Sequence, residues 1–107
     1  MGSADLALAQ SPQTFSGIAS YYAKNYSGKT ARGDRYDGSK FTAAHRTLPF
    51  GTRLVVTDPK SHRSVTVIVN DRGPFTKGRV LDLSYAAAGV LRMHDRGVMR
   101  VTAVIDQ

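Results

Sequence analysis

The fold is decided by residues 52–69, which read TRLVVTDPKSHRSVTVIV. Within residues 52–57 and again within residues 64–69, side chains alternate between two faces with the period of two that is typical of a β-strand. Between these runs, residues 58–63 (DPKSHR) have the turn-favouring composition of a hairpin connection. The second run is apolar on both faces, with Ile68 opposite its valines, which predicts a strand buried on both sides. The stretch therefore predicts a β-hairpin.

Further β-like runs lie on both sides of this hairpin. Residues 16–22 (SGIASYY) are aromatic and β-prone, and residues 98–105 (VMRVTAVI) alternate apolar with polar side chains. One helix is expected over residues 84–91 (SYAAAGVL), with Asp82 or Ser84 as its N-cap. Four or more strands around one short helix, joined by glycine-rich connections, favour a small closed β-barrel of mainly β class.

Length and composition fit a single small domain. The chain has 107 residues, of which 41% are hydrophobic and 21% charged, and it has no cysteine. The lack of cysteine excludes disulfides, cysteine-ligated metal centres and a thiol nucleophile. No apolar run reaches the ~20 residues of a membrane-spanning helix. Residues 1–14 are predicted to be a flexible N-terminal tail that includes cloning residues, and residues 15–107 to form the domain.

The formal charge of +7 suggests a polyanionic partner. Nucleic acid is not the expected one, because the lysines and arginines are scattered and no RNA-binding or zinc-finger signature is present. Bacterial cell wall is another polyanion. A basic surface that has no partner explains the charge equally well.

Residues 30–51, TARGDRYDGSKFTAAHRTLPFG, combine little hydrophobic periodicity with many side chains that do chemistry. The candidates in this segment are Asp34, Tyr36, Asp37, Thr42 and His45. The two aspartates are three residues apart, so their Cα atoms lie within ~10 Å even in an extended loop. Paired carboxylates are the minimum requirement for cleaving a glycosidic bond, one as proton donor and one as base or charge stabiliser. Two solvated acids that stabilise turns are the alternative.

A third aspartate, Asp71, stands where a buried strand runs into the tight turn of residues 70–74 (NDRGP). Functional side chains are often presented at such strand ends. The structural alternative is an aspartate that accepts backbone N–H bonds to hold the turn, or that pairs with Arg72 or Arg79.

Four segments, in this order and spacing, resemble the rare lipoprotein A (RlpA) family: TARGDRYD, TAAHRTLPFGTRLVVT, SVTVIVNDRGPF and GRVLDLSYAAAGVL. The resemblance extends from residue 17 to about residue 104. It implies a six-stranded double-psi β-barrel with one or two short helices. It also implies a bacterial envelope protein that acts on peptidoglycan as a lytic transglycosylase, cleaving the MurNAc–GlcNAc bond of peptide-free glycan strands with formation of a 1,6-anhydro product.

The same resemblance implies a set of catalytic residues. The essential acid of the family falls on Asp34, its partner carboxylate on Asp37, its histidine on His45, and a further buried aspartate on Asp71. Asp34 stands where relatives usually have glutamate. The shorter side chain withdraws the carboxyl by up to ~1.5 Å, the length of one carbon–carbon bond.

The implied reaction needs a carboxyl that is protonated near neutral pH. This group donates to the glycosidic oxygen and then takes the proton of the C6 hydroxyl of N-acetylmuramic acid. We expect Asp37 and Asp71 to crowd Asp34 and to raise its pKa. The same two aspartates would stabilise the oxocarbenium-like charge, and His45 would orient a carboxylate or hydrogen-bond the sugar.

The candidates for substrate binding are Tyr21, Tyr22, Tyr36, Thr42 and Arg72. The tyrosines are expected to stack on sugar rings, with core packing as the alternative for the pair Tyr21 and Tyr22 in the first strand. Arg72 is expected to contact an anionic lactyl group, with a structural ion pair to an aspartate as the alternative.

Two other classes of function remain open from the sequence. A metal site could use the three aspartates and His45, but the three histidines are far apart in the chain and no paired-histidine spacing exists, so we expect no metal and no cofactor. A non-catalytic, wall-binding barrel of the expansin or barwin type is the alternative function. In either case the expected partner is a glycan strand, the expected state is a monomer, and the expected location is the bacterial cell envelope, either periplasmic, secreted or as an outer-membrane lipoprotein.

Overall fold

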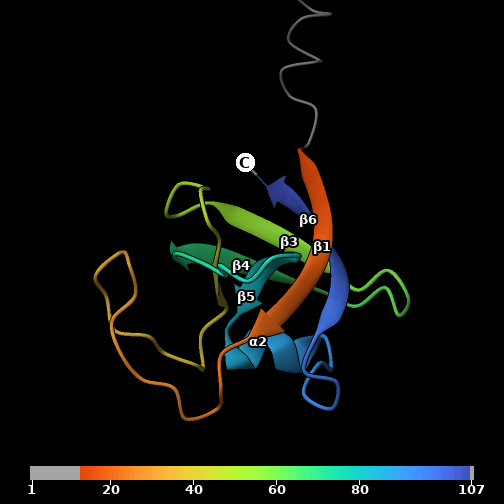
Figure 1. Ribbon diagram of the computed structural model, residues 1–107. Coiled ribbons are helices and arrows are strands. Elements are labelled where there is room, and N and C mark those ends of the chain that lie inside the picture. Colours follow the sequence, from red (N-terminus) through yellow and green to blue (C-terminus); the bar gives the residue numbers. More distant parts are fainter. Residues whose placement is uncertain (1–12, 107) are drawn as a thin grey trace, which may run out of the picture.

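The structure, a computed structural model, describes residues 13–106. It contains six strands and one helix in this range (Figure 1). In chain order these are β1 (Thr14–Tyr21), β2 (Thr42–Ala44), β3 (Arg53–Thr57), β4 (Ser64–Asp71), β5 (Arg79–Leu83), α2 (Tyr85–Val90) and β6 (Met99–Asp106). Within this range no helix has the length and apolar character needed to cross a membrane.

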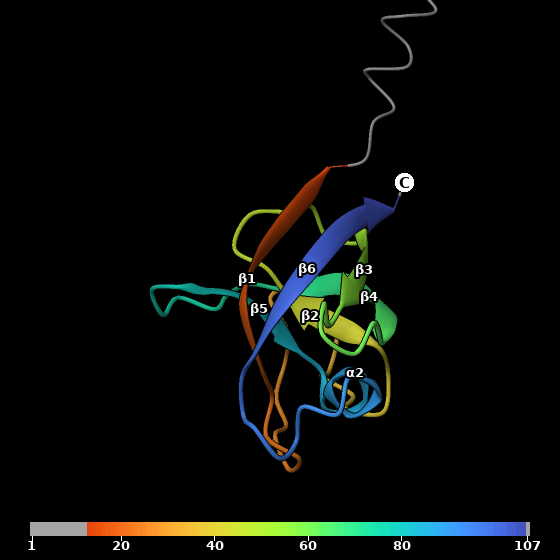
Figure 2. The same ribbon diagram turned by 90° about the vertical axis from the view of Figure 1, so that its right-hand side faces the viewer.

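The six strands close into a barrel in the order β1-β5-β2-β4-β3-β6. Two of the neighbouring pairs, β1 with β5 and β2 with β4, run parallel, and the other four pairs run antiparallel. Figure 2 views the same barrel from the side, with α2 at one end of it. The predicted closed barrel with a short helix is confirmed.

The predicted hairpin is formed by β3 and β4, with Val56 opposite Val65. Leu54, Val56, Val65, Val67 and Val69 all point into the core, where each is at least 94% buried. The expectation that β4 is buried on both faces is wrong, because its outward Thr66 is exposed and its outward Ile68 is only half-buried. β4 therefore has the one-sided burial that is typical of an antiparallel or mixed barrel strand.

The helix begins where one of the two predicted caps places it. Ser84 is the N-cap, and its hydroxyl accepts a hydrogen bond from the backbone N–H of Ala87 at 3.2 Å. Asp82, the other predicted cap, lies two residues earlier, inside β5. The Asp82 side chain therefore does not cap the helix; it accepts a hydrogen bond from the hydroxyl of Ser20.

The N-terminal boundary differs slightly from the prediction. β1 begins at Thr14, which pairs with Val104 of β6, so the barrel starts one residue before the predicted domain boundary at residue 15. Residues 1–12 of the predicted tail lie outside the described residues.

Candidate active site

A tight turn over residues 29–35 carries the first candidate carboxylate. Lys29 and Arg35 form a β-bridge across its base, and the backbone N–H of Thr30 donates to the carbonyl of Asp34 at 2.8 Å. Gly33, with a φ of 109°, occupies a backbone conformation that favours glycine. The turn attaches to the end of β4, because the Arg32 N–H donates to the carbonyl of residue 70 at 3.2 Å.

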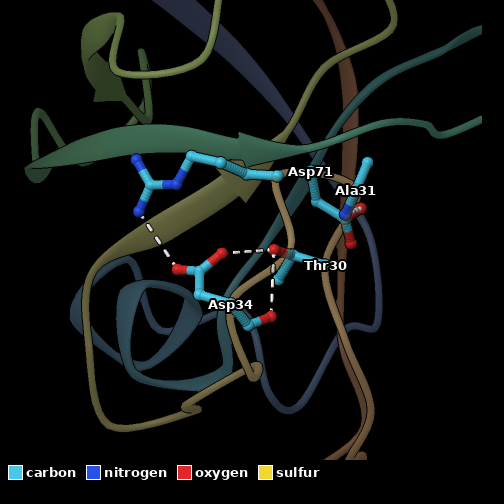
Figure 3. Close-up of polar contacts among 5 residues, drawn as sticks. Thr30, Ala31, Asp34 and Asp71 are labelled. Carbon is cyan, nitrogen blue, oxygen red and sulfur yellow. Dashed lines mark hydrogen bonds and ion pairs between the residues drawn. The ribbon is translucent and has the colours of Figure 1, made fainter.

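Asp34 is exposed and firmly ionised. The Thr30 hydroxyl donates to its Oδ1 at 2.5 Å, and the Arg32 guanidinium donates to its Oδ2 at 3.0 Å (Figure 3). These two interactions, with Thr30 the larger cause, lower the pKa of Asp34 to about 2. The expectation of a raised pKa in the free protein is therefore wrong, because Asp34 is surrounded by hydrogen-bond donors rather than by other carboxylates.

Asp71 is held at the end of β4 by three donors. Its Oδ1 accepts from the backbone N–H groups of Ala31 at 2.7 Å and of Arg72 at 2.9 Å. Its Oδ2 accepts from the Tyr22 hydroxyl at 2.5 Å. Figure 3 shows Thr30 between Asp34 on one side and Ala31 with Asp71 on the other. Two consecutive residues of one turn thus connect two aspartates that are 37 positions apart.

The structural reading of Asp71 as an acceptor of backbone N–H groups is confirmed by these contacts. The alternative ion pair is not formed, since among residues 13–106 the side chain of Asp71 has no salt bridge to Arg72 or Arg79. The binding of the Ala31 N–H across the site means that Asp71 also fixes the turn that carries Asp34.

A third carboxylate, Asp82, also lies near Tyr22. Burial, the hydrogen bond to Asp71 and the negative charges of Asp71 and Asp82 together raise the pKa of the Tyr22 hydroxyl. Asp82 accepts a hydrogen bond from the hydroxyl of Ser20 on β1. We call Asp34, Asp71 and Asp82 the carboxylate row.

Asp37 does not join this row. Its Oδ1 accepts from the N–H and the hydroxyl of Ser39 at 2.9 and 2.6 Å, which closes a local turn. These bonds lower the pKa of Asp37. The alternative reading of a loop acid that stabilises its own turn describes this contact pattern.

His45 joins the site through its backbone. Its N–H donates to the carbonyl of Asp71 at 3.1 Å, next to the pairing of β2 with β4. The ring Nδ1 accepts from the N–H groups of Thr47 and Leu48, both at 3.1 Å, so the other ring nitrogen carries the proton. Burial, followed by the positive charges of Arg46 and Arg72, lowers the pKa of His45. The ring is thus neutral and holds its own loop.

The tyrosine candidates divide into two groups. Tyr36 is buried, stacks on Tyr22 with ring centroids 4.5 Å apart, and accepts a hydrogen bond from the N–H of Tyr85 at 3.1 Å. Tyr36 therefore packs in the interior, contrary to the expectation that it stacks on a sugar ring. Tyr21 and Tyr22 are half-buried and reach the surface groove described below.

Arg72 braces a loop instead of pairing with an aspartate. Its guanidinium donates to the carbonyls of His45 and Leu48 at 3.2 and 2.8 Å and lies 4.0 Å above the centre of the Phe50 ring. Thr42 lies on β2, where its backbone is bonded to Ser84.

A groove of about 420 Å³ lies beside the row. Its lining residues come from the end of β1, the segment between β4 and β5, and β5 itself: Ser20, Tyr21, Tyr22, Arg72, Gly73, Pro74, Phe75, Thr76, Arg79 and Asp82. Three predicted substrate-binding residues, Tyr21, Tyr22 and Arg72, are among them, whereas Tyr36 and Thr42 are not. The structure adds Asp82 and Phe75, which the sequence reasoning did not select as site residues.

No part of residues 13–106 brings three histidine or acidic side chains together in a way that could hold a metal ion. The four candidate ligands are separated by their hydrogen bonds. Asp37 and the His45 ring are bound within their own loops, and Asp34 and Asp71 are each bound to the residue 30–31 turn.

A closed six-stranded barrel in which two parallel pairs are combined with antiparallel neighbours is the architecture of a double-psi β-barrel. The family described as lytic transglycolase matches residues 14–103. The chain therefore belongs to this lytic transglycolase family of double-psi β-barrel domains.

Curated relatives agree with this assignment. The chain is 52% identical over 92 residues to the probable endolytic peptidoglycan transglycosylase RlpA of Synechocystis, a match that covers 85% of this chain and 29% of that protein. It is 47% identical over 92 residues to the endolytic peptidoglycan transglycosylase RlpA of Pasteurella multocida, covering 85% of this chain and 31% of that protein. The chain thus spans about a third of the length of these relatives.

Solved structures with the same fold include Streptomyces papain inhibitor, with a TM-score of 0.72, 28% identity and coverage of 88% of this chain and 96% of that one. The apo expansin of Clavibacter michiganensis has a TM-score of 0.70 at 24% identity, covering 89% of this chain and 51% of that one. The second likeness concerns the fold alone.

Proposed function

We propose that this domain is a peptidoglycan lytic transglycosylase that cleaves the MurNAc–GlcNAc bond of peptide-free glycan strands and forms a 1,6-anhydro product. The observation that carries the proposal is the link between Asp34 and Asp71 through Thr30 and Ala31, beside an open groove. Paired carboxylates are the equipment of glycosidic bond cleavage, and Tyr22, which donates to Asp71, lines the groove. Membership of the lytic transglycolase family and the names of the RlpA relatives support the same reaction.

Asp34 is the proposed proton donor and acceptor. Its proton passes to the glycosidic oxygen as the bond from C1 to that oxygen breaks. The C6 hydroxyl oxygen of the same sugar then bonds to C1, and its proton returns to Asp34. No water is consumed. The negative charge of Asp71 favours the positive charge that develops at C1, because fixed charges stabilise a transition state without reorganising.

The low pKa of Asp34 in the free protein sets a condition on this mechanism. A glycan strand that covers the exposed carboxylate removes water from it, and desolvation raises the pKa of a carboxyl. We propose that docking of the glycan also displaces the Arg32 guanidinium from Oδ2. The acid form is then produced in the complex rather than in the free domain.

Arg32→Ala should therefore accelerate cleavage near neutral pH. Loss of the guanidinium raises the pKa of Asp34, so that a larger share of the free domain carries the proton. We expect kcat/KM to rise severalfold near pH 7, and the advantage over the parent to persist at lower pH and to shrink only as the pH falls toward about 2, where Asp34 of the parent is itself protonated. An Arg35→Ala variant controls for the loss of one positive charge. A slower Arg32→Ala enzyme would contradict the proposal.

The second candidate function is a non-catalytic glycan-binding barrel. The ionised state of Asp34 favours it, since a carboxylate with a pKa of about 2 is a poor proton donor at neutral pH. In both cases the partner is a glycan strand, and the domain acts as a monomer at the bacterial cell envelope.

Purified peptidoglycan strands, with and without their stem peptides, separate the two candidates. The proposal predicts that the domain releases soluble fragments from the peptide-free strands and fewer from the peptide-bearing strands. Strands that co-sediment with the domain but keep their length would identify a binding module instead.

A further inference from the structure

We propose that the groove between β1, β5 and the segment joining β4 to β5 is a sugar-binding subsite, in which Phe75 stacks on a pyranose ring and Asp82 accepts hydrogen bonds from its hydroxyl or acetamido N–H groups. This inference rests on the proposed function, because it names where a ring of the same glycan is held.

Asp82 supplies the polar floor of the groove. Its Oδ1 is bound by the Ser20 hydroxyl, which fixes the orientation of the carboxylate. Among the described residues no protein donor is bound to its Oδ2, and this oxygen lies beside Gly73, another lining residue, where an added Cβ would come within 3.9 Å of it. A carboxylate with one fixed and one available oxygen is suited to binding a sugar N–H or O–H group.

Phe75 supplies an apolar rim. Its side chain is 78% exposed, the largest exposed fraction among the exposed large hydrophobic residues of the described chain. In Figure 2 the segment between β4 and β5 projects from the side of the barrel. A large apolar ring held in water at the edge of a groove indicates a binding surface, and the C–H face of a pyranose is a suitable partner for it.

The segment that carries Phe75 is held in place by Arg46. Arg46 donates through Nη1 to the carbonyls of Pro74 and Arg79 at 3.1 and 2.8 Å, and so joins the two ends of the projecting segment. A braced segment presents Phe75 with little loss of conformational entropy on binding.

The groove is continuous with the carboxylate row. Tyr22 lines the groove and donates its hydroxyl to Asp71, and Arg72 lines it next to Asp71 in the chain. A volume of about 420 Å³ accommodates roughly one or two sugar rings on the scale of known ligand pockets. A strand that places one ring between Phe75 and Asp82 can therefore extend past Tyr22 toward Asp71.

The test uses a peptide-free glycan tetrasaccharide. Its binding is measured by NMR titration of the labelled domain, and its cleavage is measured by steady-state kinetics. Phe75→Ala should weaken binding about tenfold, because an aromatic contact contributes up to about that factor. Asp82→Asn should weaken it to a similar extent through the loss of a charged acceptor. In cleavage, both variants should raise KM more than they lower kcat.

The matched control is Phe41→Ala. Phe41 is also an exposed phenylalanine, at 47%, but it does not line the groove, so its removal should leave binding unchanged. Because Phe75 is exposed, its replacement is not expected to affect folding, and thermal unfolding checks this for Asp82→Asn.

The outcomes separate this inference from the proposed function. If the parent cleaves glycan and both groove variants bind and cleave as the parent does, the subsite is overturned and the function stands. If the parent binds glycan without cleaving it, and Phe75→Ala binds about tenfold more weakly, the subsite is supported and the transglycosylase activity fails. A parent that binds no glycan overturns both.

Discussion

Asp34→Asn should lower the rate of anhydro-product formation by about 10² to 10⁴-fold, the usual effect of removing a general acid. The amide is nearly isosteric and still accepts the hydrogen bond of Thr30, but it cannot donate a proton and take it back. Binding of the glycan should change little. Initial rates of product release, measured by liquid chromatography, give the first quantity, and NMR titration gives the second.

Two further variants make this result specific. Asp95→Asn removes an exposed carboxylate in the turn before β6 and should cleave at the rate of the parent. Asp34→Glu keeps the acid and tests the reach of the side chain, which is longer by ~1.5 Å. A rate that rises means that the site suits the longer side chain, and a rate that falls means that it is adapted to aspartate. Cleavage by Asp34→Asn at the parent rate would refute the assignment of Asp34.

Asp71→Ala should lower the free energy of unfolding by about 3 kcal/mol, because it deprives three donors of a charged acceptor. The donors are the N–H groups of Ala31 and Arg72 and the Tyr22 hydroxyl. For a domain of this size the loss corresponds to a fall in Tm of about 15 °C, measured by calorimetry.

The matched control is Asp37→Ala, whose carboxylate binds only the N–H and hydroxyl of Ser39 in its own turn. This substitution should lower the free energy of unfolding by about 1 kcal/mol. If the two variants lost equal stability, the view that Asp71 connects the residue 29–35 turn to the barrel would be wrong, since the Asp37 contacts are local.

The fold could be predicted where the sequence pattern is self-contained. In the β3–β4 hairpin, burial alternates along all of β3 and along β4 from residue 64 to residue 69, and Ser84 caps α2 by a local hydrogen bond. β2 was not identified, because three residues of sequence TAA are too short for a periodic signal and take their position from β4 and β5 on either side. β5 was likewise missed, since its register is set by the parallel pairing with β1.

Only part of the candidate site follows from the sequence, since Asp37 is bound in its own turn and Asp82 lines the groove. The resemblance placed Asp34 and Asp71 together, and the structure joins them through Thr30 and Ala31. The state of Asp34 depends on side-chain geometry, although Thr30 and Arg32 stand close to it in the sequence and were a usable signal for a lowered pKa. Asp82 was considered only as a helix cap, because its partner Ser20 lies 62 positions away.

The central claim is that the C6 hydroxyl of the sugar, and not water, closes the reaction. Cleavage of peptide-free glycan in water enriched in heavy oxygen, with mass spectrometry of the fragments, tests it directly. The account predicts anhydro ends that are lighter than reducing ends by one water and that contain no heavy oxygen. Reducing ends that carry heavy oxygen would identify a hydrolase and contradict the account, as would glycan strands left intact by the parent domain.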